Sequence, residues 1–501
     1  MPDQVRRATR GSKSKRRRPR ASVLLAISVV FLAGSFASPA SAAQSREYRF
    51  SGSVSVDRTR THAFPVPAPA TITAVLDWSD GSADLDLALK NPSGKTVATS
   101  STVANPERLR YVTKKTSGTW NVVVISRSGA VDYSATVNVR PHGVQLWAPE
   151  HIRRAVYSRE DALADARRFD LITSFWWRYE PYVEAMHRAN PNLTMYHYAN
   201  SHAVQAGQGP PAHPEDWYAK DADGNYVREP SGNWVMDISN AGWVGAVSNE
   251  CGEAIDRGFD GCFLDVLGLG PFWLWSAVPI SPATGQPYTM AEWNQASLSL
   301  AAAVRDALSP HPVMGNSLGA GWRYWDSALP SSAYLDVLDR MATEGFVRYP
   351  NDPIGAHRRE RDWRKDVDML ADAASQGKQV LVVTSTATGG TRAQKDAWHR
   401  YTLASFLLGT NEEQWFSFRY GASQDPTTVH AWWKLELGSP QAQYEKKDGV
   451  YQRRFSKGKV LVNPTRSTYR VSLGGRYVDL AGNVRSMITL RAFSGAILRK
   501  A

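Results

Sequence analysis

The feature that most constrains the fold is a regular alternation of short apolar segments with helix-like segments between about residues 142 and 430. Eight segments have the length and composition of buried strands: 144–147, 169–175, 193–198, 261–264, 312–315, 340–343, 379–383 and 414–417. Helix-like stretches lie between them, at 159–168, 242–257, 297–308, 363–376 and 391–408. Strands that alternate with helices form parallel sheets, and eight such units predict a closed (β/α)₈ barrel. An open doubly wound sheet is the competing fold, but no Gly-rich dinucleotide fingerprint follows any strand.

The first 42 residues have the three parts of a secretory signal. Nine Lys or Arg residues precede an apolar run at 23–33, and the small residues Ala40-Ser41-Ala42 follow it. The run is too short for a typical membrane span, which needs about 20 apolar residues, although an uncleaved anchor is the alternative. We therefore expect a secreted, extracellular protein with no stable membrane insertion after signal cleavage.

The flanks of the barrel segment predict two further domains. Residues 45–140 contain short alternating stretches broken by turns, and residues 440–501 return to short strands, so each segment predicts a β-sandwich. The expected organisation is therefore a signal peptide at 1–42, a β-sandwich at 45–140, a TIM barrel at 142–435 and a second β-sandwich at 440–501.

Charge and cysteine content exclude several classes of protein. The net charge is +12, but removal of residues 1–42 leaves only +4. This small positive charge is not typical of a nucleic-acid-binding protein, which usually has clustered Lys and Arg on one face. Two cysteines, Cys251 and Cys262, could form one local disulfide or remain buried thiols. No metal or phosphate-binding motif stands out, so we expect no cofactor and no metal.

Two acids occupy the positions where barrel enzymes carry their chemistry. Asp265 directly follows the fourth apolar strand and Glu344 follows the sixth. The carboxyl ends of barrel strands meet at one mouth, and glycosidic cleavage needs a carboxyl pair, of which one acts as proton donor. Glu344 would need a raised pKa for that role, and proximity to ionised Asp265 would raise it.

Further polar and aromatic residues follow the same strands. Aromatic faces stack on sugar rings, and amide and hydroxyl groups bind sugar hydroxyls, so these residues are the candidates for substrate binding. An alternative for Asp237 is to cap the helix that begins near residue 242. The candidates are Asp237, Tyr198, Asn200, Trp176, Trp234 and Asn316.

Several motifs resemble known families. The stretches 234–237 and 258–265, the Tyr198-Ala199-Asn200-Ser201 segment and the C-terminal pattern at 462–495 resemble hypothetical glycosyl hydrolase-like TIM-barrel families. These families are similar to the endo-α-1,4-polygalactosaminidase group, and the resemblance covers about residues 142–500. It implies a retaining glycoside hydrolase with Asp265 as nucleophile and Glu344 as acid/base. Residues 83–87, 91–94 and 117–120 resemble the bacterial pre-peptidase C-terminal sandwich, which we interpret as non-catalytic.

Two rival functions remain. The Gly315-Asn316-Ser317-Leu318-Gly319 segment matches the nucleophile elbow of serine esterases, but the next residues are Gly-rich rather than helical. A non-catalytic extracellular carbohydrate-binding protein is the other alternative, because a barrel does not guarantee activity. We favour a secreted, monomeric glycoside hydrolase that cleaves a polysaccharide or oligosaccharide with the Asp265 and Glu344 pair.

Overall fold

The structure is a computed structural model. It describes residues 46–66, 70–103, 105–113, 117–141, 144–149, 158–190, 192–210, 212–268, 270–338, 340–410, 414–421, 429–434 and 437–501. The predicted signal peptide lies outside the described residues.

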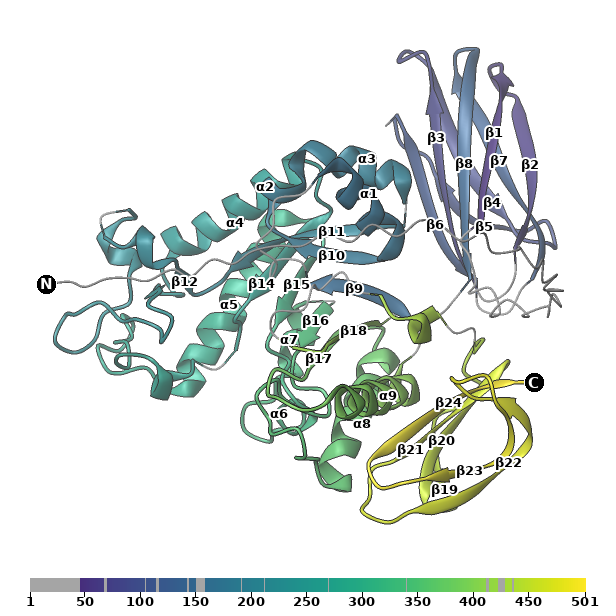
Figure 1. Cartoon of the computed structure of the whole chain (residues 1–501). Helices are drawn as coiled ribbons and strands as arrows, with labels where there is room; N and C mark the ends of the chain where they lie inside the picture. The colour runs from purple at the N-terminus through teal and green to yellow at the C-terminus, as the bar shows by residue number, and fades with distance from the viewer. Residues whose placement is uncertain are drawn as a thin grey trace, which may run out of the picture. The chain divides into compact units, whose positions relative to one another are not determined.

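Eight parallel strands close into a barrel at the centre of the chain, which confirms the predicted fold (Figure 1). The strands follow one another around the barrel in chain order, and the last closes against the first. Their interior is filled by a row of large apolar side chains that includes Trp147, Tyr196, Phe263 and Trp415. The strands are β9 (Gln145–Pro149), β10 (Leu171–Ser174), β11 (Thr194–Asn200), β14 (Gly261–Asp265), β15 (Val313–Asn316), β16 (Arg340–Thr343), β17 (Gln379–Ser385) and β18 (Trp415–Arg419).

Helices cover the outside of these strands, and local signals in the sequence start several of them. The Asn240 side chain accepts hydrogen bonds from the N–H groups of Gly242 and Trp243 at the start of α4, and Thr289 and Thr391 begin capping boxes at α5 and α9. The helices are α1 (Arg159–Arg168), α2 (Trp176–Tyr179), α3 (Val183–Ala189), α4 (Ala241–Asp256), α5 (Met290–Leu308), α6 (Gly321–Tyr324), α7 (Ala333–Val337), α8 (Glu360–Ser375) and α9 (Arg392–Gly409), with short 3₁₀ turns η2 (Glu180–Tyr182) and η6 (Ala431–Lys434).

The two cysteines form a disulfide that joins α4 to β14. Both residues are fully buried. The sequence left the bridge and the free thiols open, and the structure has the bridge. It anchors the strand that ends at Asp265.

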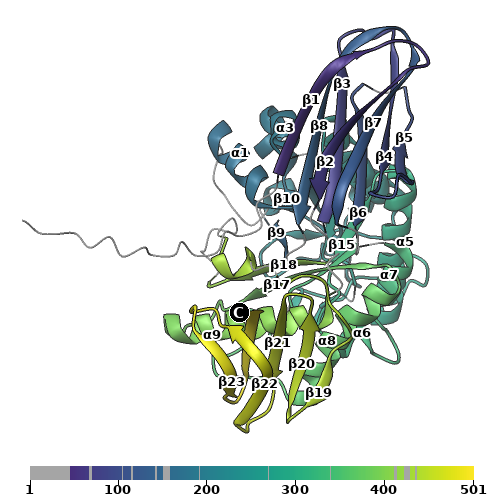
Figure 2. The same cartoon turned by 90° about the vertical axis from the view of Figure 1, so that its right-hand side faces the viewer.

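The N-terminal segment is a sandwich of two four-stranded antiparallel sheets with a core of its own (Figure 2). One sheet has the order β1-β8-β3-β6 and the other the order β2-β7-β4-β5. The strands are β1 (Arg46–Val54), β2 (Thr59–Val66), β3 (Ala70–Trp78), β4 (Asp84–Lys90), β5 (Thr96–Ser100), β6 (Glu107–Thr113), β7 (Gly118–Ser128) and β8 (Val131–Pro141).

At the C-terminus, the segment predicted as a sandwich forms one six-stranded antiparallel sheet of order β19-β20-β21-β24-β22-β23. One set of its side chains, including Leu461, Val471 and Leu498, forms a separate small core. Another set, including Val460, Val462 and Ile497, joins the core that surrounds the barrel helices. The strands are β19 (Glu445–Lys447), β20 (Val450–Phe455), β21 (Gly458–Asn463), β22 (Tyr469–Val478), β23 (Val484–Leu490) and β24 (Ser494–Lys500).

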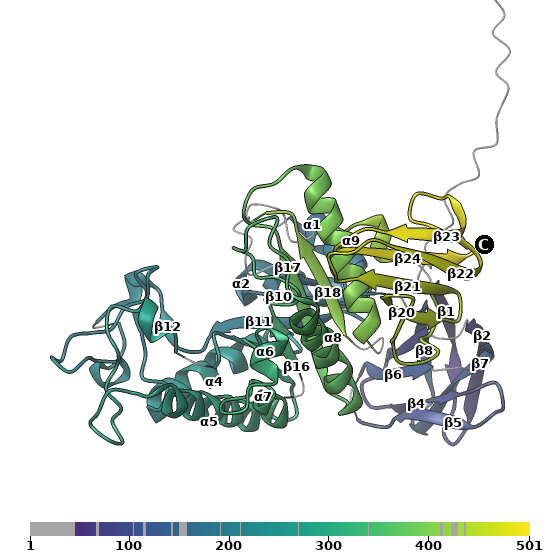
Figure 3. The same ribbon diagram turned by 90° about the horizontal axis from the view of Figure 1, so that it is seen from below.

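Two of the segments that follow barrel strands are unusually long. The chain between β11 and α4 contains the small antiparallel pair β12 (Ala203–Val204) and β13 (Trp234–Val235), with 3₁₀ turns η3 (Ala206–Gln208) and η4 (Glu215–Trp217). The chain between β14 and α5 contains η5 (Phe272–Leu274). Figure 3 shows the β12 region extending beyond the ends of α4 and α5. Within the part of the chain that the structure describes, no helix combines the length and apolar character that crossing a bilayer requires.

Candidate active site

Four polar side chains lie at or near the carboxyl ends of four neighbouring strands. Asp265 ends β14, Asn316 ends β15, Glu344 directly follows β16, and Tyr198 lies two residues before the end of β11. The parallel registers place Asn200 beside Asp265 and Leu264 beside Gly315. The strand order therefore brings together the two carboxylates that the sequence singled out, at the barrel end where enzymes of this fold carry their active sites.

Three donors orient the half-buried carboxylate of Asp265. The Tyr198 hydroxyl donates to Oδ2 at 2.7 Å. The backbone N–H of Val266 and the side-chain amide of Asn316 donate to Oδ1 at 2.9 and 2.8 Å. Hydrogen bonds to an ionised acceptor are stronger than neutral ones, so these three groups hold the carboxylate in one orientation.

The amide of Asn316 also connects the two carboxylates. Its Nδ2 donates to Asp265 Oδ1 at 2.8 Å and to Glu344 Oε1 at 3.2 Å. Because one nitrogen reaches both oxygens, these two oxygens lie no more than about 6 Å apart. Asn316 itself is buried, so the bridge lies on the floor of the site.

Glu344 combines access to solvent with a perturbed acidity. Its side chain is exposed, although the residues on both sides of it in the chain are buried. Desolvation by the protein atoms around the carboxyl raises its pKa, and the negative charge of Asp265 raises it further. The Asn316 hydrogen bond and the positive charge of Arg419 oppose this rise but do not reverse it.

Arg419 is a site residue that the sequence did not reveal. It is the last residue of β18, on the far side of the barrel from β14, and it is half-buried. Burial lowers its pKa, and the charge of Glu344 counteracts that effect. The only sequence signal for Arg419 was its position, a positively charged residue just after a predicted strand. Such residues are also common on surfaces that have no functional site.

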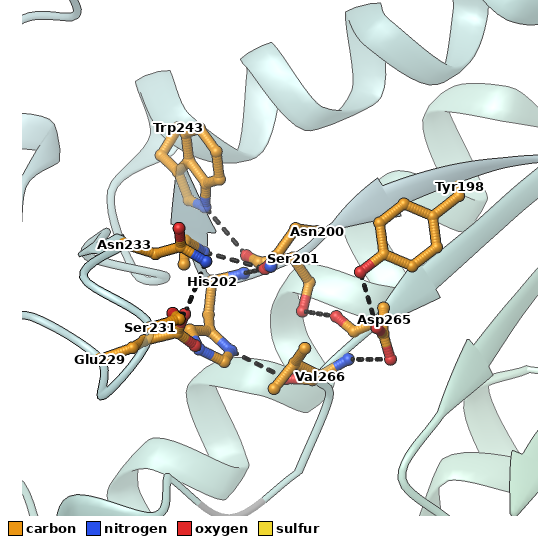
Figure 4. Close-up of polar contacts among 11 residues, drawn as sticks. Tyr198, Asn200, Ser201, His202, Glu229, Ser231, Asn233, Trp243, Asp265 and Val266 are labelled. Atoms are coloured by element: carbon orange, nitrogen blue, oxygen red, sulfur yellow. Dashed lines mark hydrogen bonds and ion pairs between the residues drawn. The ribbon is translucent and has the colours of Figure 1, made fainter. Parts of the chain in front are cut away.

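The backbone behind Asp265 is held by the segment that follows β11 (Figure 4). The Ser201 hydroxyl and N–H both donate to the Asp265 carbonyl oxygen, at 2.7 and 3.1 Å. The side-chain oxygen of Asn200 accepts from the N–H groups of His202 and Ala203. Asn200, which the sequence suggested for substrate binding, thus has its side-chain oxygen engaged in this turn.

The aromatic residues after β10 point in different directions. The Trp176 ring lies against the Arg257 guanidinium, at 4.3 Å from the ring centroid. Phe175 packs edge-on against Tyr198, with ring centroids 5.1 Å apart, and Trp177 stacks on Phe175 at 4.4 Å. Phe175, rather than Trp176, therefore packs against the tyrosine that binds Asp265, and Trp177 stacks on Phe175.

Trp234 and Asp237 lie in the long segment between β11 and α4. Arg228 covers the Trp234 ring at 3.4 Å, and the ring nitrogen donates to the carbonyl of Ala206. The Asp237 carboxylate is buried and accepts from the N–H and hydroxyl of Ser239 at 3.0 and 2.7 Å. Asp237 also lines a cavity of about 490 Å³ beside Tyr218, Lys220 and Tyr288.

Four of the described tryptophans in the barrel region have exposed side chains. Among the described tryptophans, those that are exposed all follow barrel strands, with exposed fractions between 43% and 68%. Large apolar rings are costly to leave in water, and such rings mark binding surfaces for ligands with apolar faces. They are Trp177 after β10, Trp273 after β14, and Trp322 and Trp325 after β15.

The Ser317 motif lacks the environment of a serine esterase. The N–H of Ser317 donates to Asn316 Oδ1 at 2.8 Å, and the short helix α6 begins only at Gly321. The three histidines that follow it in the chain have partners elsewhere: His357 stacks on Trp398, His399 bonds to Tyr420, and His430 packs against Tyr420 and Trp433. Among the described residues, no group of three His, Cys, Asp or Glu side chains could hold a metal ion.

A family model and several solved structures match parts of this chain. Residues 182–459 match the model of hypothetical glycosyl hydrolase family 15. A search of curated proteins finds no match. Among solved structures, the glycoside hydrolase domain of PelA from Pseudomonas aeruginosa aligns over 56% of this chain and 94% of its own, at 15% identity and a TM-score of 0.38. Ega3 from Aspergillus fumigatus, in complex with galactosamine, aligns over 57% and 94%, at 14% identity and a TM-score of 0.36. The maltogenic α-amylase AmyB from Thermotoga neapolitana aligns over 70% and 97%, at 11% identity and a TM-score of 0.45.

Proposed function

The chain belongs to hypothetical glycosyl hydrolase family 15 and is a glycoside hydrolase; on that premise we propose that it cleaves a polysaccharide with retention of anomeric configuration, with Asp265 as nucleophile and Glu344 as acid/base. The observation that carries the proposal is the single Asn316 amide that binds both carboxylates. Retaining enzymes have carboxyl groups about 5–5.5 Å apart, whereas inverting enzymes need about 6.5–9.5 Å to admit a water molecule. A limit of about 6 Å between the bridged oxygens favours retention.

The two steps of the reaction assign different work to the two carboxyl groups. In the first step, an Asp265 oxygen forms a bond to the anomeric carbon while the glycosidic C–O bond breaks, and Glu344 gives its proton to the leaving oxygen. In the second step, Glu344 takes a proton from water as the water oxygen attacks the anomeric carbon, and the bond to Asp265 breaks. The raised pKa of Glu344 supports its role as the group that starts the cycle protonated.

The exposed rings support a polymeric substrate. Trp177 and Trp273 follow β10 and β14, whereas Trp322 and Trp325 follow β15, the strand between those that carry Asp265 and Glu344. Exposed rings on three different segments would offer stacking surfaces to several sugar units of one chain. The Trp273→Ala and Trp322→Ala variants should each raise KM for a long chain by about 2–10-fold, the value of one aromatic contact. A short oligosaccharide that does not reach these rings should be unaffected, and Met487→Ala serves as the surface control.

We also propose that the protein is secreted. The signal-like pattern of residues 1–42 supports this location, and so does the disulfide between Cys251 and Cys262, because such bonds persist in oxidising compartments. Detection of a chain that begins near residue 43 in the culture medium would test the proposal. Recovery of only the full-length chain in the cell would contradict it.

The function is tested by expressing residues 43–501 and measuring the release of reducing ends from a panel of bacterial and plant polysaccharides. The parent should release sugar, Asp265→Asn should not, and Asp223→Asn in an exposed loop should match the parent. Proton NMR of the first product should show the anomer of the substrate. An inverted product would contradict the retaining mechanism, and binding without release would favour a carbohydrate-binding protein.

A further inference from the structure

His202 is a buried histidine whose two ring nitrogens both face acceptors. It follows β11, and only 2% of its surface is exposed. Its Nε2 lies 2.7 Å from Glu229 Oε1, and its Nδ1 lies 3.2 Å from the carbonyl oxygen of Val266 (Figure 4). A backbone carbonyl and an ionised carboxylate can only accept hydrogen bonds, so the ring satisfies both only when each nitrogen carries a proton. With Glu229 ionised, an imidazolium that donates from both ring nitrogens fits this geometry.

Glu229 is arranged as the anionic partner of this ring. Asn233 and Ser231 donate to its second oxygen, Oε2, at 2.9 and 3.0 Å. Burial acts to raise the pKa of Glu229, but the hydrogen bond and charge of His202, together with the bonds from Asn233 and Ser231, lower it. The contact with His202 is therefore an ion pair inside the protein.

The other groups around the pair are mainly aromatic. The rings of Trp275 and Trp293 face His202, with centroids 5.3 and 6.5 Å away. Among the described residues, the titratable side chains near this shell include Tyr288, which packs against Trp293, and Asp265, which is adjacent to Val266 in the chain. They also include Tyr198, whose pKa is raised by burial and, to a smaller extent, by the charge of Glu229. The contacts of the His202 ring nitrogens are those with Glu229 and Val266.

Val266 has a backbone conformation that needs support. Its φ angle is 61°, in the left-handed region that β-branched residues avoid. In this conformation its N–H points back to Asp265 Oδ1 at 2.9 Å, while its carbonyl faces His202. The peptide unit before Val266 supplies the N–H that binds Asp265, and the peptide unit after it supplies the carbonyl that faces His202. Val266 thus links the buried pair to the carboxylate.

We propose that His202 and Glu229 form a positioning pair, whose charged contact holds the Val266 carbonyl, keeps Val266 in its left-handed conformation and so orients the Asp265 carboxylate. Neither residue touches the reacting atoms. The orienting role is independent of the reaction, whereas its effect on turnover rests on the proposed function of Asp265 as nucleophile.

The first test uses thermal stability and needs no substrate. Glycine adopts a left-handed φ without strain, so Val266→Gly should raise the Tm of the parent by about 1–3 °C. In the His202→Gln or Glu229→Gln protein, Val266 can leave the left-handed conformation. Val266→Gly should then raise the Tm by less than half as much as it does in the parent. His399→Gln is the matched control, because His399 is equally buried but bonds to Tyr420 and Trp433. Equal gains in all backgrounds would overturn the proposal.

The second test uses turnover and compares the effects on kcat and on KM. Both Glu229→Gln and His202→Gln should lower kcat about 10–100-fold with little change in KM, because substrate contacts remain. A loss of kcat without a rise in KM would separate positioning of Asp265 from general damage to the site, and the Tm of each variant would show that it is folded.

Failure of the proposed function and failure of the positioning role give different results. If the parent hydrolyses nothing, the proposed function fails, and the stability test still decides whether the pair holds Val266. If the parent is active but the two variants keep its kcat, or raise KM instead of lowering kcat, the positioning role is contradicted.

Discussion

The ends of β14 and β16 carry the same chemical group in two different environments. Asp265 is half-buried, and three donors bind its carboxylate. Glu344 is exposed to the mouth and accepts one bond from the shared Asn316 amide, and its pKa is raised. Environment rather than residue type separates a carboxylate that stays oriented from a carboxyl group that can hold a proton.

The difference also extends to the supporting structure. The end of β14 is anchored by the disulfide to α4, by Ser201 on the Asp265 carbonyl and by Val266 in a left-handed conformation. A nucleophile must meet the anomeric carbon at a defined distance and angle, whereas a proton donor tolerates more movement. The end of β14 thus has more supporting contacts, and it carries Asp265, the residue whose proposed role has the stricter geometric requirement.

The largest expected effect comes from removing the nucleophilic oxygen. Asp265→Asn preserves the size of the side chain but cannot form the covalent intermediate, so kcat should fall at least about a thousandfold on every substrate. Steady-state kinetics with the thermal stability of both proteins would measure this. A loss below tenfold in a fully folded variant would transfer the nucleophilic role to another residue.

Removal of the proton donor should have a large effect that depends on the leaving group. Glu344→Gln should lower kcat by about 10²–10⁴-fold for natural glycosides, and much less for aryl glycosides whose leaving group needs no proton. In the parent, activity should fall as the pH rises through the raised pKa of Glu344, because the protonated form disappears. This alkaline limb should vanish in the variant, and its persistence would assign it to another group.

Substitution of the shared amide should alter both carboxyl groups at once. Asn316→Ala removes a hydrogen bond to a charged acceptor at Asp265, so kcat should fall about 10–100-fold. It also removes a contribution that lowers the pKa of Glu344, so the alkaline limb of kcat/KM should move to higher pH. A shift to lower pH would contradict the bridging role.

The smallest effect on catalysis is expected from the disulfide. Replacing both Cys251 and Cys262 by Ala should lower the free energy of unfolding by about 2–3 kcal/mol, a value typical of a short closed loop. The kcat at low temperature should change less than about threefold, since Ser201 and Val266 still support Asp265. Denaturant unfolding and kinetics at 10 °C would separate these effects, with a conservative Ala variant of the exposed Met487 as control.

Short-range patterns in the sequence were sufficient to predict the barrel and the two acids at its mouth. Each barrel strand is an apolar run bounded by polar or turn residues, and an acid that directly follows such a run must lie at the carboxyl end of its strand. That rule finds Asp265 and Glu344 without any knowledge of how the strands pair.

The role of a side chain was harder to predict wherever it depends on a contact between distant segments. Asn316 was expected to bind substrate, but its amide bridges two carboxylates that come from β14 and β16. Trp176 and Trp177 are adjacent in the sequence, and only the turn of α2 decides which ring lies near Phe175 and Tyr198. The alternation of side chains along a strand does not predict where a side chain points once the strand has turned into a helix.

The sequence by itself determined the order of the barrel strands and of the five longest helices, the choice of a closed barrel and the positions of two acids, because these follow from local hydrophobic patterns. Only the tertiary structure decided the acidity of Glu344, the contribution of Arg419 and the ion pair of His202 with Glu229. Burial and electrostatic energy depend on which atoms surround a group in space, and the residues that surround this site come from strands and loops far apart in the chain.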